Sequence, residues 1–196
     1  MSLEKNKFLV IKNIIPKEVC KFAYDYLLLK RKVADTLYQK KLISKGSITE
    51  WGCWGDGQVE KAYALYADLV TEVLLEKCRP IMEKHLKMKL VPTYSYCRVY
   101  VKGNDLKPHI DRKSCEFSTT LNLGGDPWPI YLEPNNEINL KPGDMLIYKG
   151  CEVKHWRKPF KGELCVQTFL HYNKINGIKY DGRDHLGLPH YTKIYK

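Results

Sequence analysis

The chain has 196 residues, and its composition excludes several classes of protein. Apolar residues make up 44% and charged residues 28%, a globular mixture with enough length for a hydrophobic core without disulfides. No apolar run approaches the roughly 18 residues that a membrane-spanning helix needs, and the N-terminal stretch carries charges where a secretory signal has its apolar segment. We therefore expect a single domain over residues 1–196 that remains in the cytoplasm and does not enter a membrane.

The net charge of +11 is spread along the chain rather than gathered in one tail. Dispersed charge bears on solubility and ligand steering, not on fold. The interleaving of aromatic and basic residues that marks RNA-binding modules is missing. A nucleic-acid partner is therefore less favoured than a protein or a small molecule.

The cysteines are odd in number and scattered. They are Cys20, Cys53, Cys78, Cys97, Cys115, Cys151 and Cys165. No CxxC pair occurs, which argues against a disulfide framework and against a thiolate zinc site. We expect them to be free thiols that pack as small apolar side chains.

The first part of the chain, residues 1–90, has mainly helical patterns. A short strand is expected at 8–11, and Pro16 suits the first position of a helix that runs from 17 to about 32 with a helical apolar period. Residues 45–58, with four glycines, are expected to form a loop. A second helix is expected from about 59 to 86, with a kink or interruption at Pro80.

From residue 91 the pattern changes to short β-branched and aromatic runs separated by Gly, Pro and Asn. The expected strands are 94–101, 117–123, 130–132, 137–140, 145–148 and 164–172. Together these patterns predict an α+β fold that is mainly β. The helices of residues 1–90 would pack on one side of a β-sandwich or jelly roll formed by 91–173, followed by a tail, 174–196.

Three residues form a candidate metal site. His109 and Asp111 are two positions apart, so on an extended segment both side chains point to the same face. His155 follows a predicted strand, where a jelly roll could return the chain beside the first pair. Two imidazoles and one carboxylate on one face of an octahedron leave three positions open, as in iron(II) oxygenases. The competing interpretation is a surface histidine beside a loop aspartate. We interpret His171, on a strand, as a histidine of the core or rim.

Residues 94–172 resemble the double-stranded β-helix, or cupin-like jelly roll, of the 2-oxoglutarate/iron(II) dioxygenases, close to the prolyl 4-hydroxylase-like group. The shared features lie in the same order along the chain. They are the opening 8–16, Tyr100, Gly103, His109-Ile110-Asp111, Ser118–Asn122, Gly124-Gly125, Leu140–Ile147, His155, Pro159, Gly162 and Phe169.

The resemblance implies roles for several residues. His109, Asp111 and His155 would be both the iron ligands and the catalytic site, and Tyr100 would donate a hydrogen bond to 2-oxoglutarate. The implied reaction hydroxylates a C–H bond and releases succinate and CO₂ from 2-oxoglutarate and O₂, with ascorbate as a candidate reductant. The substrate would be a protein side chain such as proline, or a small molecule.

One departure from the family concerns the co-substrate. The family usually carries an Arg or Lys about two residues beyond the glycine that follows the distal histidine, where it pairs with the distal carboxylate of 2-oxoglutarate. Here that position is Leu164. Another cation would have to serve, because a buried carboxylate requires a charged donor. Arg98 and Arg157 are the first candidates, with Arg112 as a third, and each has the alternative of being a surface arginine.

Two further functions remain open on the sequence. The chain could be a jelly-roll module that holds a metal without turnover, or a member of the same fold directed at nucleic acid. Release of succinate from 2-oxoglutarate under air separates an enzyme from a module.

Overall fold

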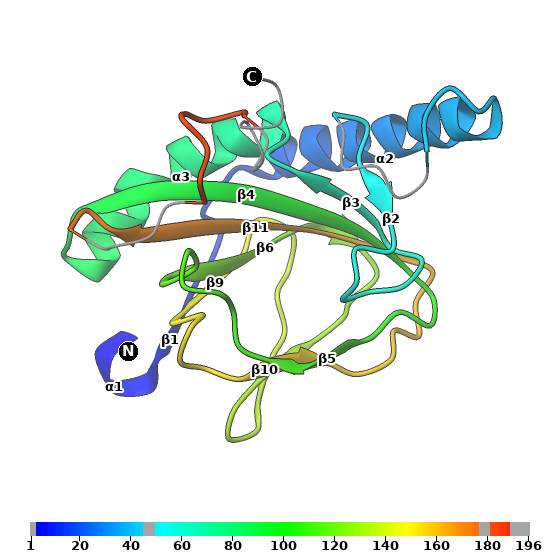
Figure 1. Cartoon of the computed structure of the whole chain (residues 1–196). Helices are drawn as coiled ribbons and strands as arrows, with labels where there is room; N and C mark the ends of the chain where they lie inside the picture. Colours follow the sequence, from blue (N-terminus) through cyan, green and yellow to red (C-terminus); the bar gives the residue numbers. More distant parts are fainter. Residues whose placement is uncertain (1–2, 45–49, 177–180, 189–196) are drawn as a thin grey trace.

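The computed structural model of the protein describes residues 3–44, 50–176 and 181–188. Two long helices and a set of antiparallel strands dominate this part of the chain (Figure 1). The elements are α1 (Leu3–Asn6), β1 (Phe8–Ile11), α2 (Lys17–Gln39), β2 (Cys53–Trp54), β3 (Tyr63–Tyr66), α3 (Leu69–Leu86), β4 (Leu90–Val101), β5 (Leu106–His109), β6 (Ser118–Gly125), β7 (Ile130–Leu132), β8 (Asn136–Ile138), β9 (Met145–Tyr148), β10 (His155–Arg157) and β11 (Leu164–Lys174).

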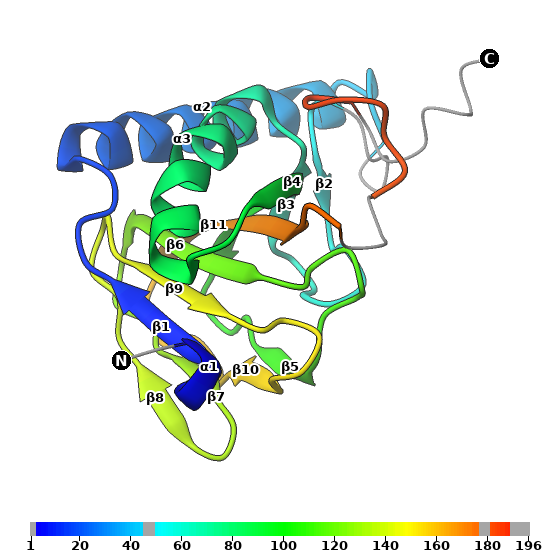
Figure 2. The same ribbon diagram turned by 90° about the vertical axis from the view of Figure 1, so that its left-hand side faces the viewer.

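The strands form two sheets. The larger has the order β1-β9-β6-β11-β4-β3-β2, and the smaller has the order β5-β10-β7-β8. Both helices, α2 and α3, lie over the face of the larger sheet that is turned away from the smaller one (Figures 1 and 2). None of the helices in the described residues is long and apolar enough to cross a membrane.

Side chains on the central strands divide between two interiors, because successive residues of a strand point to opposite faces. On β11, Val166 and Leu170 belong to the core beneath the helices, whereas Cys165 belongs to a second apolar cluster between the sheets. Gln167 and His171 follow the alternation of Cys165 and are also buried. The space between the sheets therefore contains buried polar side chains beside its apolar cluster.

The expected architecture is confirmed: helices cover one side of a mainly β fold. Two expected strands, 130–132 and 145–148, have the predicted bounds. The strand at 94–101 begins earlier, at Leu90, and helix α2 continues to Gln39 rather than ending near residue 32.

The expected helix over residues 59–86 was wrong in its first part. Strand β3 occupies Tyr63–Tyr66, and α3 begins at Leu69 after Asp68, whose side chain accepts a hydrogen bond from the Val70 amide. Pro80 lies inside α3 and does not end it. The expected loop at 45–58 contains the short strand β2, and residues 45–49 lie outside the described part of the chain. So do residues 177–180 and 189–196 of the expected tail.

Candidate metal centre

His109 and His155 are brought together by strand pairing. His109 ends β5, His155 begins β10, and the two residues are direct partners in the antiparallel register of the smaller sheet. Their imidazole rings are 4.2 Å apart between centroids. Sequence patterns missed both strands, each of which is only a few residues long. The approach of the two histidines was expected, but their direct pairing across 45 intervening residues was not.

Each imidazole is fixed in one orientation by a backbone carbonyl. Nδ1 of His109 lies 2.8 Å from the carbonyl oxygen of Lys107, and Nδ1 of His155 lies 3.0 Å from that of Val153. A carbonyl can only accept, so Nδ1 carries the proton in both rings. The Nε2 lone pairs are then available for a metal, as in metal-binding histidines held by their other ring nitrogen.

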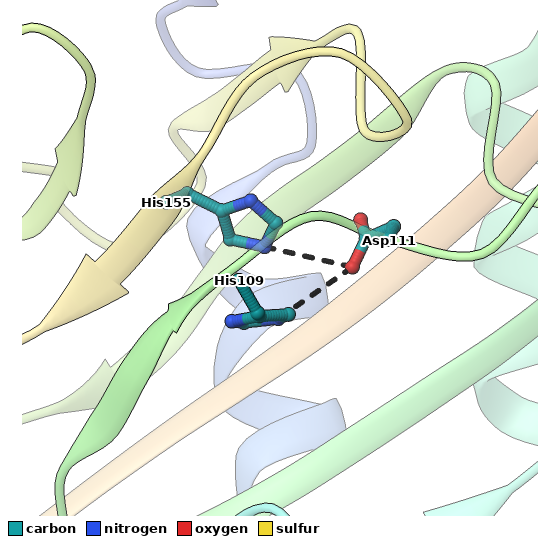
Figure 3. Close-up of side chains that lie close together, drawn as sticks. All are labelled: His109, Asp111 and His155. Carbon is teal, nitrogen blue, oxygen red and sulfur yellow. Dashed lines mark ion pairs between the residues drawn. The ribbon is translucent and has the colours of Figure 1, made fainter.

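Asp111 completes the cluster from the loop after β5. Its backbone amide donates to the carbonyl of Gly150 at 2.8 Å. Its Oδ1 lies 3.6 Å from Nε2 of His109 and 3.5 Å from Nε2 of His155 (Figure 3). The three donor atoms are all within 4.8 Å of one another. Donors on one face of an octahedron with bonds of about 2.1 Å would be about 3 Å apart, so the three side chains need little movement to share a metal.

The cluster lies at the edge of the space between the sheets. The side chain of His155 is 3% exposed, that of Asp111 is 14% exposed and that of His109 is 23% exposed. Burial lowers the pKa of the His155 imidazole, an effect that nearby Asp111 partly opposes. The exposed edge of His109 leaves one side of the cluster open to solvent.

Several residues near the cluster were missed by sequence reasoning. The Tyr148 hydroxyl lies 3.3 Å from Nε2 of His155. The Ser118 hydroxyl lies 2.5 Å from Oδ2 of Asp111 and 3.2 Å from Nδ1 of His171. His171 was expected to be a core or rim histidine; it is indeed buried, and it also contacts the site through Ser118. Tyr148 ends strand β9, whose bounds were predicted correctly. Because Tyr148 is two residues from Leu146, the sequence could have indicated that both side chains point to the same face of this strand.

Arg98 points into the same interior but already has an acidic partner. Its guanidinium bonds to the carboxylate of Asp56 at 2.6 Å, and the Tyr96 hydroxyl donates to the same carboxylate. Burial opposes the charge on Arg98, but Tyr100 and Asp56 outweigh it and raise the arginine pKa. Burial likewise opposes ionisation of Asp56, but Arg98 and Tyr96 hold its pKa below the usual value.

Arg157 is buried without such a partner. It is 2% exposed, and no acidic side chain of the described residues pairs with it. One guanidinium nitrogen donates to the carbonyl of Trp128, whose ring lies 4.9 Å from the guanidinium carbon, while Nε has no hydrogen-bond partner. Burial lowers the pKa of Arg157, an effect that Tyr100, Cys165 and Tyr148 oppose. Arg157 ends strand β10, which the sequence patterns did not predict.

The alternation of β11 turns Leu164 away from the interior between the sheets. Leu164 packs at the helix side of the sheet, against the core beneath α2 and α3. Its neighbour Cys165 faces the interior between the sheets. Burial raises the pKa of the Cys165 thiol, and the nearby Arg157 guanidinium opposes that rise only in part. Arg157 therefore brings a positive charge to β11 from the adjacent sheet. Arg112, the third candidate, pairs with Asp181 at 2.6 Å and is half exposed.

Tyr100 lies between these groups and is fully buried. Its hydroxyl accepts a hydrogen bond from Arg98 at 3.5 Å, and its ring meets that of Trp128 edge-on at 4.8 Å. Within the described part of the chain the Tyr100 hydroxyl donates to no acceptor.

No family model matches the sequence, and no curated protein matches it significantly. Known structures do match the fold. A prolyl-4-hydroxylase from Pseudomonas putida aligns with a TM-score of 0.57 at 12% identity, covering 86% of this chain and 94% of that one. The viral collagen prolyl hydroxylase of Paramecium Bursaria Chlorella virus-1, in a 2-oxoglutarate complex, aligns with a TM-score of 0.57 at 12% identity over 86% and 97%.

HygX from Streptomyces hygroscopicus, with nickel, 2-oxoglutarate and hygromycin B bound, aligns with a TM-score of 0.62 at 11% identity, over 89% of this chain and 85% of that one. At sequence identities of 11–12%, this structural similarity establishes the fold alone. The fold is the jelly roll of the 2-oxoglutarate/iron(II) oxygenases, as the sequence resemblance predicted.

Proposed function

We propose that this protein is an iron(II)- and 2-oxoglutarate-dependent dioxygenase that hydroxylates a C–H bond. The observation that carries the proposal is the convergence of Nε2 of His109, Nε2 of His155 and Oδ1 of Asp111 in the interior of an oxygenase fold. The proposed metal ligands are these three residues, and the proposed co-substrate residues are Arg157 and Tyr100.

The donor set suits iron(II). Two neutral imidazoles and one carboxylate, with no cysteine among the metal-binding groups of the described residues, are the ligands of open non-haem iron sites rather than of closed zinc sites. Both Nδ1 protons are already used by backbone carbonyls, so no rearrangement of the rings is needed to present Nε2. Three positions would remain open for 2-oxoglutarate and O₂.

The unpaired charge of Arg157 supports 2-oxoglutarate as the co-substrate. An arginine buried without an acidic partner is costly, and a ligand carboxylate would remove that cost. Arg157 is two residues from His155 on the same strand, so its guanidinium extends from the metal site into the same interior. A dicarboxylate could thus reach from the metal to Arg157, with Tyr100 donating a hydrogen bond. Arg98 is not favoured for this role, because Asp56 already neutralises it.

When bound, iron(II) would supply the activation of O₂ that couples decarboxylation of 2-oxoglutarate to hydroxylation. The chain itself would orient the ligands and place a cation for the co-substrate, and the buried rings of Tyr100, Trp128 and Phe160 would exclude water beside them. The substrate would enter where His109 is exposed; a protein side chain such as proline and a small molecule both remain candidates.

The test is succinate formation from 2-oxoglutarate under air with iron(II) and ascorbate, followed by mass spectrometry. We expect succinate in excess of the amount formed by iron alone, and we expect Asp111→Ala to reduce it to that background. Equal succinate from the two proteins would show that the cluster does not support the reaction. Metal binding with no succinate at all, with peptides and small molecules supplied, would instead favour a metal-binding module.

A further inference from the structure

Two polar side chains in series reach the metal-binding carboxylate of Asp111 on the side of Oδ2, the oxygen that does not face the histidines. The Ser118 hydroxyl, at the start of β6, lies 2.5 Å from Oδ2 of Asp111. On its other side the same hydroxyl lies 3.2 Å from Nδ1 of His171, on β11. Ser118 is fully buried and His171 is 6% exposed, so solvent does not compete for these contacts.

The proton positions in this chain follow from the partners. The Ser118 hydroxyl has one proton and two acceptors within reach, Oδ2 of Asp111 at 2.5 Å and the carbonyl of Cys115 at 3.3 Å. The carboxylate is charged and closer, so it receives the proton. The hydroxyl oxygen is then free to accept, and His171 must donate from Nδ1. The bonds thus run from His171 to Ser118 to Asp111.

Gly150 leaves the space that this contact needs. A Cβ atom at Gly150 would lie 2.2 Å from Oγ of Ser118, 2.6 Å from the carbonyl oxygen of Cys115 and 2.7 Å from Oδ2 of Asp111. Its carbonyl also accepts the Asp111 backbone amide at 2.8 Å. A methyl group here would therefore separate the serine from the carboxylate without removing any polar atom.

We propose that Ser118 and His171 are positioning residues that hold Asp111 as a one-oxygen metal ligand. Because the serine proton occupies Oδ2, only Oδ1 is presented to Nε2 of His109 and of His155. A carboxylate free to rotate could instead offer both oxygens and occupy one of the positions that the co-substrate and O₂ require. The inference rests on the proposed metal site and assigns these residues a role in its geometry.

The test uses cobalt(II) as a redox-stable probe and follows its visible absorption during titration of the full chain. Ser118→Ala and Gly150→Ala should each weaken cobalt(II) binding about 10- to 100-fold, the usual effect of losing a partner behind a ligand. They should also change the shape of the absorption bands, which reports the number and arrangement of the ligands. Thr119→Ala is the matched control, because it removes a buried hydroxyl from the same strand on the opposite face, where it accepts from the Leu170 amide.

His171 is tested by a pair of variants. An asparagine amide nitrogen can stand in for Nδ1 as a donor, whereas leucine cannot. We expect His171→Leu to weaken cobalt(II) binding and alter the spectrum, and His171→Asn to restore both toward the wild-type values. A purely structural histidine would not show this rescue by a donor.

The outcomes separate the two proposals. If the wild-type protein binds no cobalt(II), the proposed metal site is wrong. If it binds cobalt(II) and both Ser118→Ala and Gly150→Ala fold, bind within threefold of wild type and keep the same spectrum, the site stands and the positioning role is wrong. If Thr119→Ala causes the same loss as Ser118→Ala, the effect arises from general loosening of β6, and the positioning role is again overturned.

Discussion

The guanidinium of Arg98 and the carboxylate of Asp56 form a buried ion pair at 2.6 Å inside the fold. Both side chains are less than a tenth exposed. Arg157, in the same interior, has no acidic partner among the described residues. Two arginines that the sequence left as equal candidates therefore have different electrostatic environments, and they should respond differently to replacement.

Arg157→Met should abolish tight binding of 2-oxoglutarate while leaving the protein at least as stable. Removing the cation that pairs with the buried carboxylate of 2-oxoglutarate should cost roughly 2–5 kcal/mol of binding free energy, which lowers the affinity tens-fold or more. Replacing a buried, unmatched charge by an apolar side chain of similar length should be neutral or stabilising. Calorimetry on the metal-loaded protein without O₂, together with urea unfolding, measures both quantities.

Arg98→Met is the matched variant, and we expect the opposite result. It leaves Asp56 buried without its cation, so the free energy of unfolding should fall by roughly 3–5 kcal/mol. The dissociation constant for 2-oxoglutarate should change less than threefold. If Arg98→Met raises the dissociation constant for 2-oxoglutarate more than Arg157→Met does, the assignment of the two arginines is reversed.

The buried His171 should make stability depend on pH. Burial lowers its pKa from 6.5 to about 4, so below pH 6.5 the unfolded chain binds a proton that the folded chain does not. The free energy of unfolding should therefore fall as the pH decreases from 6.5 to 4. Over that interval one such histidine contributes about 3 kcal/mol. His171→Asn should show a correspondingly smaller decrease in urea unfolding between pH 7 and 4.5; an identical decrease would mean that His171 titrates normally.

Much of the fold was predictable because its patterns are local. The alternation in residues 145–148 and the helical period after Pro16 each follow from neighbouring residues. The error at residues 59–68 has a physical origin: Tyr63–Tyr66 is apolar on both faces, because it pairs with β4 while its side chains enter two different interiors. A short strand of this kind cannot be told from a helix by periodicity.

The metal cluster was predictable for a different reason. Its three residues were found by their chemistry and spacing, whereas the pairing of His109 with His155 depends on strands too short to be recognised. Ser118, Gly150 and His171 gave no such signal, because a serine, a glycine and a strand histidine are common. Their contacts with Asp111 and with one another form only in the folded chain, where β6, β11 and the loop before β10 lie side by side.

All seven cysteines are free in the structure, and six of them are buried; Cys151 is partly exposed. We predict that the native protein contains seven reduced thiols. Alkylation of the folded protein should modify Cys151 first, and alkylation after unfolding without reductant should modify all seven. Mass spectrometry measures both, and a cysteine that reacts only after reduction would contradict this prediction and the expected cytoplasmic location.

The central claim is that His109, Asp111 and His155 bind one metal ion. The most direct measurement is the iron(II) content of the protein after anaerobic loading and desalting. We predict one equivalent of iron for the wild type and nearly none for Asp111→Ala or His155→Ala. Asp144→Ala, which removes a buried aspartate that pairs with Lys12 far from the cluster in sequence, should retain one equivalent. Full iron occupancy in both Asp111→Ala and His155→Ala, with the fold intact, would contradict the claim.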